Sequence, residues 1–446
     1  MLELDDIQHI VLTRVPSLTG RYEFLSFRHA AAGREWLKAL SDTVRSTAAV
    51  RASNDKDRRW VTVAFTCNGL RTLGVDEASL GTFPAEFVQG MAARAATLGD
   101  MGANHPDNWI DKTNSPDLHA IAILFARDAA ERQRCQTEHE KLIAQIEGAE
   151  VLSALDVEAL PFDYPRDHFG YRDRISQPVI EGSDEVPTPG SGGPFKPGEF
   201  ILGYPDDDGV QHPLPQPEIL SRHGSFIAYR RLEEHVGRFR DFLREHGETP
   251  EGQELVAAKL MGRWRSGAPL ILAPEKDDSA LAADPQRNND FNYKREDPLG
   301  YAMPLGAHIR RMNPRDTAPG MNHRRMIRRG STYGPLLPEG APDDGMERGL
   351  AALVICASLI RQFEFAQNVW INDRNFHELG NERDPIIGNQ DGTLEFKIPK
   401  RPIRKKITGL PAFTTVRGGA YFFLPGIRAL KWLATNGTPQ VDETIG

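Results

Sequence analysis

One stretch in the C-terminal half combines a histidine with a high density of arginine. Residues 306–334 read GAHIRRMNPRDTAPGMNHRRMIRRGSTYG, without a lysine, in a chain whose formal net charge is −8. A solvated basic surface normally mixes lysine with arginine, whereas arginine alone favours planar, bidentate binding of carboxylates or phosphates. The arginines concerned are Arg310, Arg311, Arg315, Arg324, Arg325, Arg328 and Arg329. The stretch therefore predicts a site for an anionic ligand.

His308 opens this stretch and is its candidate metal ligand. A lone histidine more often has a structural role than binds a metal. The arginines around His308 favour the metal-ligand interpretation here. Haem fits both features, because it has two carboxylates and its iron binds one imidazole. The alternative is a nucleic-acid patch, but only Tyr333 supplies an aromatic side chain for stacking on bases.

A second candidate site lies at residues 167–182, DHFGYRDRISQPVIEG, where Asp173 stands between Arg172 and Arg174. The simplest interpretation is an exposed ion-pair turn, which contributes little to stability. The functional interpretation is a carboxylate held over a reactive centre, with a nearby guanidinium balancing its charge.

These residues must be positioned by a mixed set of strands and helices. Strand-like runs occupy 7–13, 59–66, 119–126 and 420–425, and helical patterns occupy 31–48, 130–149 and 233–247. This alternation, without a strict βα repeat, predicts an α+β fold with largely antiparallel sheets. A length of 446 residues favours two domains. The Pro-, Gly- and Asp-rich stretch 187–217 is expected to be irregular, as a linker or as a long loop beside a site.

Composition excludes several classes of protein. The net negative charge gives no general attraction to nucleic acid or anionic membranes, and no run of 18 apolar residues could span a bilayer. The N-terminus lacks a secretion signal, and Cys67, Cys135 and Cys356 are widely separated. Buried, unpaired cysteines and a cytoplasmic protein are the resulting expectations.

With these motifs in place, the sequence resembles the longer form of the dye-decolorising peroxidase family. Gly170-Tyr171-Arg172-Asp173 leads into Ile175-Ser176-Gln177-Pro178, which is similar to the family's G-x-x-D-G motif and the stretch after it. His308-Ile309-Arg310, followed by Asn313-Pro314-Arg315, matches the context of its proximal histidine. Arg328 through Tyr333-Gly334 fits the spacing of its distal arginine. The likeness continues in order along nearly the whole chain.

The resemblance implies two ferredoxin-like domains, 1–210 with the aspartate motif and 211–446 binding haem b, in a dimeric α+β barrel-like arrangement. It implies a peroxidase that reduces hydrogen peroxide and oxidises dyes or other aromatic reductants, with no nucleic-acid or membrane partner. Homo-oligomerisation is left open.

The resemblance also implies a role for each residue of the two sites. His308 would hold the iron, with Glu364 or Asp391 as the candidate partner of its other ring nitrogen. Asp173 would move the peroxide proton, and an aspartate with an ordinary pKa of about 4 predicts an acidic optimum. Either Arg328 or the adjacent Arg329 would stabilise the charge on the departing oxygen.

Arginines that follow the histidine would bind the haem carboxylates. Arg315 is the first choice, and Arg310 or Arg311 comes next. One of these two is expected to face solvent, because neighbours in an extended segment point to opposite sides.

The residue after Asp173 departs from the family pattern, which has glycine where this chain has Arg174. Glycine at such a position often marks a backbone with positive φ, where a side chain costs roughly 1 kcal/mol. Arg174 would then point to solvent, alter the distal pocket or narrow the peroxide channel. The alternative function is a haem-binding or haem-handling protein of the same fold with weak peroxidase turnover.

Overall fold

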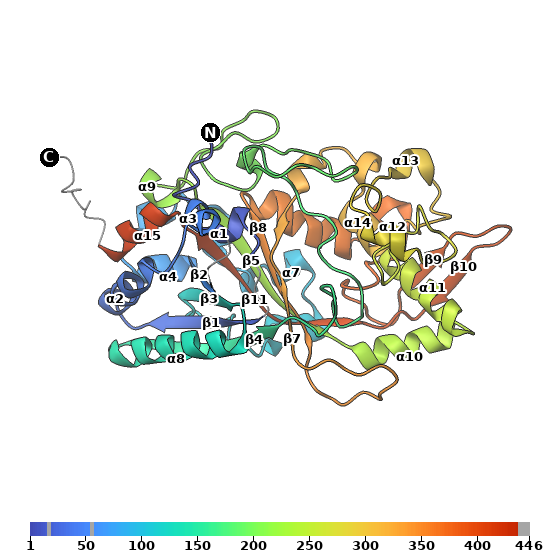
Figure 1. Ribbon diagram of the computed structural model, residues 1–446, viewed down its shortest axis with the longest axis horizontal. Coiled ribbons are helices and arrows are strands. Elements are labelled where there is room, and N and C mark those ends of the chain that lie inside the picture. Colours follow the sequence, from blue (N-terminus) through green and yellow to red (C-terminus); the bar gives the residue numbers. More distant parts are fainter. Residues whose placement is uncertain (16–18, 54–57, 436–446) are drawn as a thin grey trace.

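The centre of the molecule is a large antiparallel sheet (Figure 1). A computed structural model of the chain describes residues 1–15, 19–53 and 58–435. Within them, nine strands join in the order β4-β1-β3-β2-β11-β5-β8-β6, with β7 also paired to β8. These strands are β1 (Thr19–Phe27), β2 (Arg59–Phe65), β3 (Ala120–Ala126), β4 (Ala149–Glu158), β5 (Ser225–Glu234), β6 (Ile327–Arg328), β7 (Ser331–Tyr333), β8 (Gly349–Cys356) and β11 (Thr414–Leu424). A separate hairpin pairs β9 (Glu395–Ile398) with β10 (Lys405–Thr408).

The sheet has two halves, which come from the two halves of the sequence. β1 to β4 lie within residues 19–158, and the remaining strands of the sheet lie within 225–424. The halves join where β2 meets β11, with Phe65 opposite Phe423. The predicted division at residue 210 falls in the long segment between β4 and β5.

The outer edges of the two halves also meet. The Thr332 hydroxyl of β7 donates to the Glu158 carbonyl at the end of β4, at 2.5 Å. No backbone ladder joins β4 to β7 in the described part of the chain. The predicted α+β fold with antiparallel, barrel-like sheets is confirmed, although the barrel is not closed.

Both faces of the sheet are buried because the strands alternate large apolar side chains. Along β11, Phe423 packs into a core with Trp36 and Leu430, whereas Phe422 packs on the other face with Tyr229. This pattern follows from the two-residue period of a strand. Two smaller cores lie outside the sheet, and one of them, around Phe239, fixes the segment that carries Asp173.

The helices pack around the sheet and form a second region beside it (Figure 1). They are α1 (His9–Leu12), α2 (Ala30–Ser41), α3 (Thr47–Ala52), α4 (Cys67–Thr72), α5 (Glu77–Leu80), α6 (Ala85–Gln89), α7 (Ala95–Leu98), α8 (Ala129–Gln145), α9 (Glu218–Ser221), α10 (Val236–His246), α11 (Pro250–Met261), α12 (Ser279–Ala283), α13 (Tyr293–Glu296), α14 (His308–Met312) and α15 (Ile427–Ala434). Two π-helical segments, η7 (Leu359–Glu364) and η8 (Ala366–Asn372), follow β8. None of these helices is long and apolar enough to cross a membrane, as judged over the described residues.

Most predicted elements are confirmed, with one clear error. The strand expected at 7–13 is instead the helix α1. A short apolar run does not reveal its period, and here tertiary contacts decide, because the Gln8 side chain bonds the backbone of both Val63 and Pro425. The helix expected at 31–48 is divided into α2 and α3. The three cysteines are buried and free, as predicted.

The stretch 187–217 is irregular, as predicted, and lies along the arginine-rich segment. The Gly190 carbonyl accepts from Arg315 at 3.0 Å, and the Ser191 carbonyl accepts from Arg325 at 2.6 Å. Phe195 is buried and anchors this stretch. It is therefore a long loop packed on the candidate site.

Candidate functional site

His308 is the first residue of α14, and a carboxylate is hydrogen-bonded to one nitrogen of its imidazole. Nδ1 lies 2.8 Å from Oδ2 of Asp384, which is completely buried. The other oxygen of Asp384 accepts from the backbone N–H groups of Ile386 and Ile387. Burial opposes ionisation of Asp384, but the charge and hydrogen bond of His308 outweigh it and hold the pKa of this carboxyl below its usual range. An ionised Asp384 accepts from Nδ1–H, and in the neutral tautomer of His308 that this bond selects, Nε2 keeps its lone pair.

The predicted partners of His308 were both wrong. Glu364 instead pairs with Arg94 at 2.6 Å and accepts from the Tyr421 hydroxyl at 2.9 Å. Asp391 pairs with Arg374 at 2.8 Å. Asp384 lies 76 residues after His308. Neither a motif nor the spacing connects the two positions in the sequence.

The arginines that follow His308 are held by protein carbonyl groups. Arg310 donates to Met303 and Asp297 carbonyls at 2.9 Å, and Arg311 donates to the Trp370 carbonyl at 2.6 Å. The expectation that one of Arg310 and Arg311 faces solvent was wrong, because both are buried. The segment is helical here, so the alternation of an extended chain does not apply.

Arg315 is held in the same way, at a backbone with φ of 51°. Its guanidinium donates to the Phe291 carbonyl at 2.6 Å and lies 3.7 Å above the ring of the same residue. It also donates to Asn289 and to the Gly190 carbonyl. These contacts fasten the loop 187–217 and the segment near residue 290 to the chain that follows α14.

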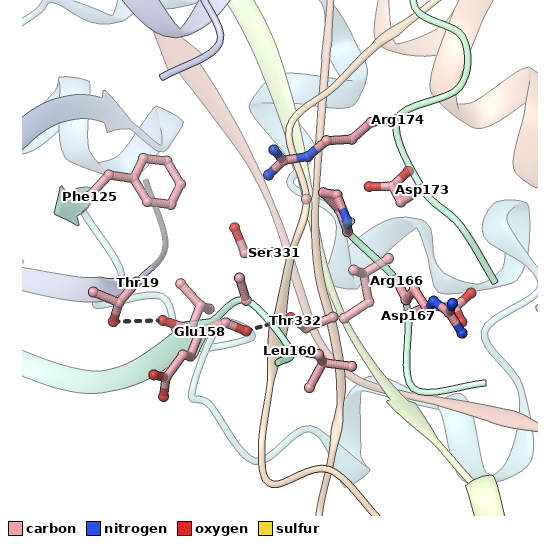
Figure 2. Close-up of a pocket in the computed structure, with 15 residues that line it drawn as sticks. Thr19, Phe125, Glu158, Leu160, Arg166, Asp167, Asp173, Arg174, Ser331 and Thr332 are labelled. Atoms are coloured by element: carbon pink, nitrogen blue, oxygen red, sulfur yellow. Dashed lines mark hydrogen bonds between the residues drawn. The ribbon is translucent and has the colours of Figure 1, made fainter. Parts of the chain in front are cut away.

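The segment that carries Asp173 folds back on itself and is anchored in a core. The Asp173 N–H donates to the Pro165 carbonyl at 2.9 Å, and the Tyr171 N–H donates to the Asp167 carboxylate at 2.8 Å. Phe169 and Tyr171 are buried in the core around Phe239. Asp173 itself is exposed and lines a cavity of about 60 Å³ at the place where β4 meets β7 (Figure 2).

Arg174 has a backbone φ of 65°, so the prediction of a glycine-like conformation at this position is confirmed. An L-residue in this region costs roughly 1 kcal/mol, which the buried anchors before it must offset. The side chain lines the same cavity as Asp173 (Figure 2). The replacement therefore lies at the candidate site.

The adjacent arginines 328 and 329 have different surroundings. Arg328 donates to the Ser176 carbonyl at 2.6 Å, and its N–H donates to the Gln177 side chain at 3.0 Å. Arg328 is close enough to Asp173 for their charges to interact: loss of surrounding water lowers the pKa of Arg328, and the carboxylate of Asp173 opposes this shift. Arg329 instead donates to the carbonyls of Ile10 and Val11 in α1, at 2.8 and 2.9 Å. The structure thus brings Arg328 to Asp173 and directs Arg329 to α1.

One loop contacts both the His308 and the Asp173 segments. A Cβ on Gly262 would stand 2.5 Å from Cγ1 of Ile309, next to His308. A Cβ on Gly267 would stand 2.8 Å from Cδ1 of Ile175, two residues after Asp173. Both glycines have positive φ, so a side chain would be strained as well as crowded. The loop fixes the two segments relative to each other.

Elsewhere, Glu199, Asp206 and His323 could each direct one ligand atom toward a common metal position. His323 bonds Glu199 at 2.7 Å, and His212 bonds Asp206 at 2.9 Å. This cluster is a self-paired ion network in the structure.

Glu382, which packs beside the His308 segment, gives a test that depends on pH. It is completely buried, with a Cβ on Gly306 reaching within 2.5 Å of its Oε2, and the Lys397 ammonium lies 3.5 Å from Oε1. Burial raises the pKa of Glu382 to about 7 against the opposing charges of Lys397 and Arg311. The folded protein thus retains a proton that the unfolded chain releases above a pKa of about 4.3.

The free energy of unfolding should therefore decrease as pH rises from about 4.5 to 7, through this group. Glu382→Gln removes the titration, so we expect the variant to gain stability relative to the unmodified protein between pH 5 and pH 7. Urea denaturation at pH 5, 6 and 7 measures this, with the exposed Glu254→Gln as control. Parallel pH profiles for the Glu382 variant and the unmodified protein would contradict the assignment.

Comparison with known proteins identifies the family. Residues 6–157 match the model of the DyP dimeric alpha+beta barrel domain. Peroxidase 2 of Mycetinis scorodonius is 32% identical over 96% of this chain and 87% of its own length. The dye-decolorizing peroxidase of Mycena epipterygia is 30% identical over 97% of this chain and 87% of its own length.

Solved structures agree with these relatives. An ancestral D-type dye-decolorizing peroxidase superposes with a TM-score of 0.85 at 32% identity, covering 96% of this chain and 98% of its own. A dye-decolorizing peroxidase in complex with 2,6-dimethoxyphenol superposes with a TM-score of 0.84 at 27% identity, covering 97% and 100%. The chain belongs to the dye-decolorising peroxidase family, whose members are haem peroxidases.

Proposed function

We propose that this chain holds haem b through Nε2 of His308, and that Asp173 and Arg328 act on hydrogen peroxide while dyes or phenols supply the electrons. The observation that carries the proposal is the imidazole of His308. Its Nδ1 is fixed by a buried carboxylate, and its Nε2 has no hydrogen bond in the described structure. An axial haem ligand needs this arrangement, because a fixed Nδ1–H sets the tautomer and increases electron donation from Nε2.

The arginines around His308 support this site from outside. Arg310, Arg311 and Arg315 have their guanidinium groups bonded to protein carbonyls. We therefore assign them to positioning α14 and the loops around it, in place of direct contact with the haem carboxylates. The charges of Arg311 and Arg315 are distributed over several carbonyl dipoles, and that of Arg310 is also paired with the Asp297 carboxylate at 3.2 Å, which makes the segment rigid.

Haem bound at His308 would supply a Lewis-acidic iron for peroxide and a store of oxidising equivalents. The chain's own residues would move the proton. The Asp173 carboxylate accepts a proton from one peroxide oxygen and delivers it to the other, so that the second oxygen leaves as water. Arg328 donates to the departing oxygen and stabilises the negative charge that develops there.

Reducing substrates are proposed to give up electrons without entering the distal site. The cavity beside Asp173 has a volume of about 60 Å³, enough for a few water molecules but too small for a dye. One relative has been solved with 2,6-dimethoxyphenol, which supports phenols as a substrate class.

The absorption spectrum with and without peroxide tests this function. We expect the haem-supplemented protein to show a Soret band that shifts when peroxide is added, followed by oxidation of an anthraquinone dye. The absence of any Soret band would contradict haem binding. A Soret band without steady-state turnover would favour the haem-handling alternative.

A further inference from the structure

Four arginines from three parts of the chain act on one another through their charges: Arg14, Arg174, Arg328 and Arg329. Loss of surrounding water, followed by the charge of Arg174, lowers the pKa of Arg14 to about 10, and Asp173 and Arg328 also act on it. Burial, followed by the charge of Arg14, lowers the pKa of Arg329 to about 9, and Arg174 and Arg328 contribute. Each of these two arginines is thus disfavoured as a cation by the positive charge of other arginines in the group.

Within the described residues these four arginines have no carboxylate partner, whereas others, such as Arg94 and Arg230, do. None of the four forms an ion pair within 4.0 Å in the described structure. Arg328 and Arg329 bond only to neutral protein groups, and Arg14 and Arg174 make no side-chain hydrogen bond with described residues. Asp173 and Glu185 are the acidic groups whose charges act on Arg14. A local excess of positive charge thus exists in a chain of net charge −8.

Arg174 brings a positive charge to the cavity that Asp173 also lines. Figure 2 shows its side chain extending from the loop across the cavity, toward Ser331 and Phe125. The buried anchors at Phe169 and Tyr171 fix the loop, and the φ of 65° fixes the direction in which the side chain leaves it. Ser331 and Thr332 add hydroxyl groups to the same wall.

We propose that Arg174 forms an anion-binding site at the entrance to the distal cavity, which holds the carboxylate or sulfonate of an aromatic reductant. The effect of this site on catalysis rests on the proposed function. Anion binding by the site can be measured without any turnover. A cavity of about 60 Å³ admits a small charged group and leaves an aromatic ring outside. Guanidinium groups suit this role because their N–H donors match two oxygens at once.

The site would select among reductants by charge. An anionic reductant gains charge-assisted hydrogen bonds that a neutral phenol cannot form. The surrounding negative charge of the protein disfavours anions elsewhere on the surface, so the arginines concentrate them at this entrance. Salt should weaken the interaction because the guanidinium of Arg174 is exposed.

Binding without peroxide tests the site directly. The probes are naphthalene-2-sulfonate and the neutral naphthalene-2-methanol, measured by calorimetry on the haem-loaded protein at low ionic strength. We expect Arg174→Gln to weaken sulfonate binding about tenfold, Arg174→Lys to retain part of it, and neither to change binding of the alcohol. Arg134→Gln, an equal change of charge on the exposed face of α8, is the control and should bind as the unmodified protein does.

Steady-state kinetics supply the second arm. Arg174→Gln should raise the ratio of KM for a sulfonated dye to KM for 2,6-dimethoxyphenol about tenfold, because only the anionic dye loses a charged partner. Equal sulfonate binding by Arg174→Gln and the unmodified protein would overturn the proposal. The proposal would also be overturned if naphthalene-2-sulfonate bound the haem-free protein but not the haem-loaded protein. The arginines would then be binding the haem carboxylates when haem is present. Intact, Arg174-dependent binding without any turnover would support the site and contradict the peroxidase function.

Discussion

His308→Ala is expected to remove the Soret band of the haem-supplemented protein and to lower dye oxidation by at least about 10³-fold. The proposed axial base would be lost, and no other imidazole in the described structure is bonded to Asp384. The variant should still fold, because His308 makes one side-chain hydrogen bond and lies at the end of a short helix. Absorption spectra, haem content and far-ultraviolet circular dichroism measure these effects together.

Asp384→Asn separates two effects: binding of the iron by His308, and the influence of the Asp384 charge on electron donation from His308. It keeps the shape of the side chain but removes the charge that fixes Nδ1–H, so we expect haem to remain and activity to decrease about 10- to 100-fold. His105→Ala, at an exposed histidine, is the matched control and should leave the spectrum unchanged. A normal Soret band in His308→Ala would assign the axial ligand to another residue.

Local patterns in the sequence were enough to predict elements, and tertiary contacts decided the pairings. The run 59–66, predicted as a strand, forms β2 over Arg59–Phe65, whereas the run 7–13 forms a helix because Gln8 bonds two distant backbone segments. The φ of Arg174 could be anticipated, because a glycine in the family motif indicates a backbone constraint that any replacement must meet.

The partners of the candidate residues could not be predicted in the same way. Asp384 is brought to His308 only by the fold, and two other acidic residues were equally plausible from the sequence. The density of arginine predicted an anionic ligand, but Arg310, Arg311 and Arg315 are bonded to carbonyls of distant segments whose positions no local pattern reveals. Residue types show which chemistry is available, and the fold determines which groups are already occupied.

The adjacent arginines allow a matched test of the distal site. We expect Arg328→Gln to lower the second-order rate constant for peroxide about 10²- to 10³-fold, because it removes the proposed donor to the departing oxygen, whose charge interacts with that of Asp173. Asp173→Asn should lower the same constant about 10²- to 10⁴-fold by removing the proton acceptor. Stopped-flow absorption with the haem-loaded protein measures these rates.

Arg329→Gln should affect stability and leave the rate of reaction with peroxide nearly unchanged. Its guanidinium bonds the carbonyls of Ile10 and Val11, so its loss should lower the free energy of unfolding by about 1–3 kcal/mol and leave the peroxide rate within about threefold. Arg328→Gln should in turn keep most of its stability, because one backbone carbonyl accepts from its side chain. If Arg329→Gln were instead the slow variant and Arg328→Gln the unstable one, the distal role would pass to Arg329. Because the two substitutions are adjacent and alter charge equally, this exchange of effects would report on geometry alone.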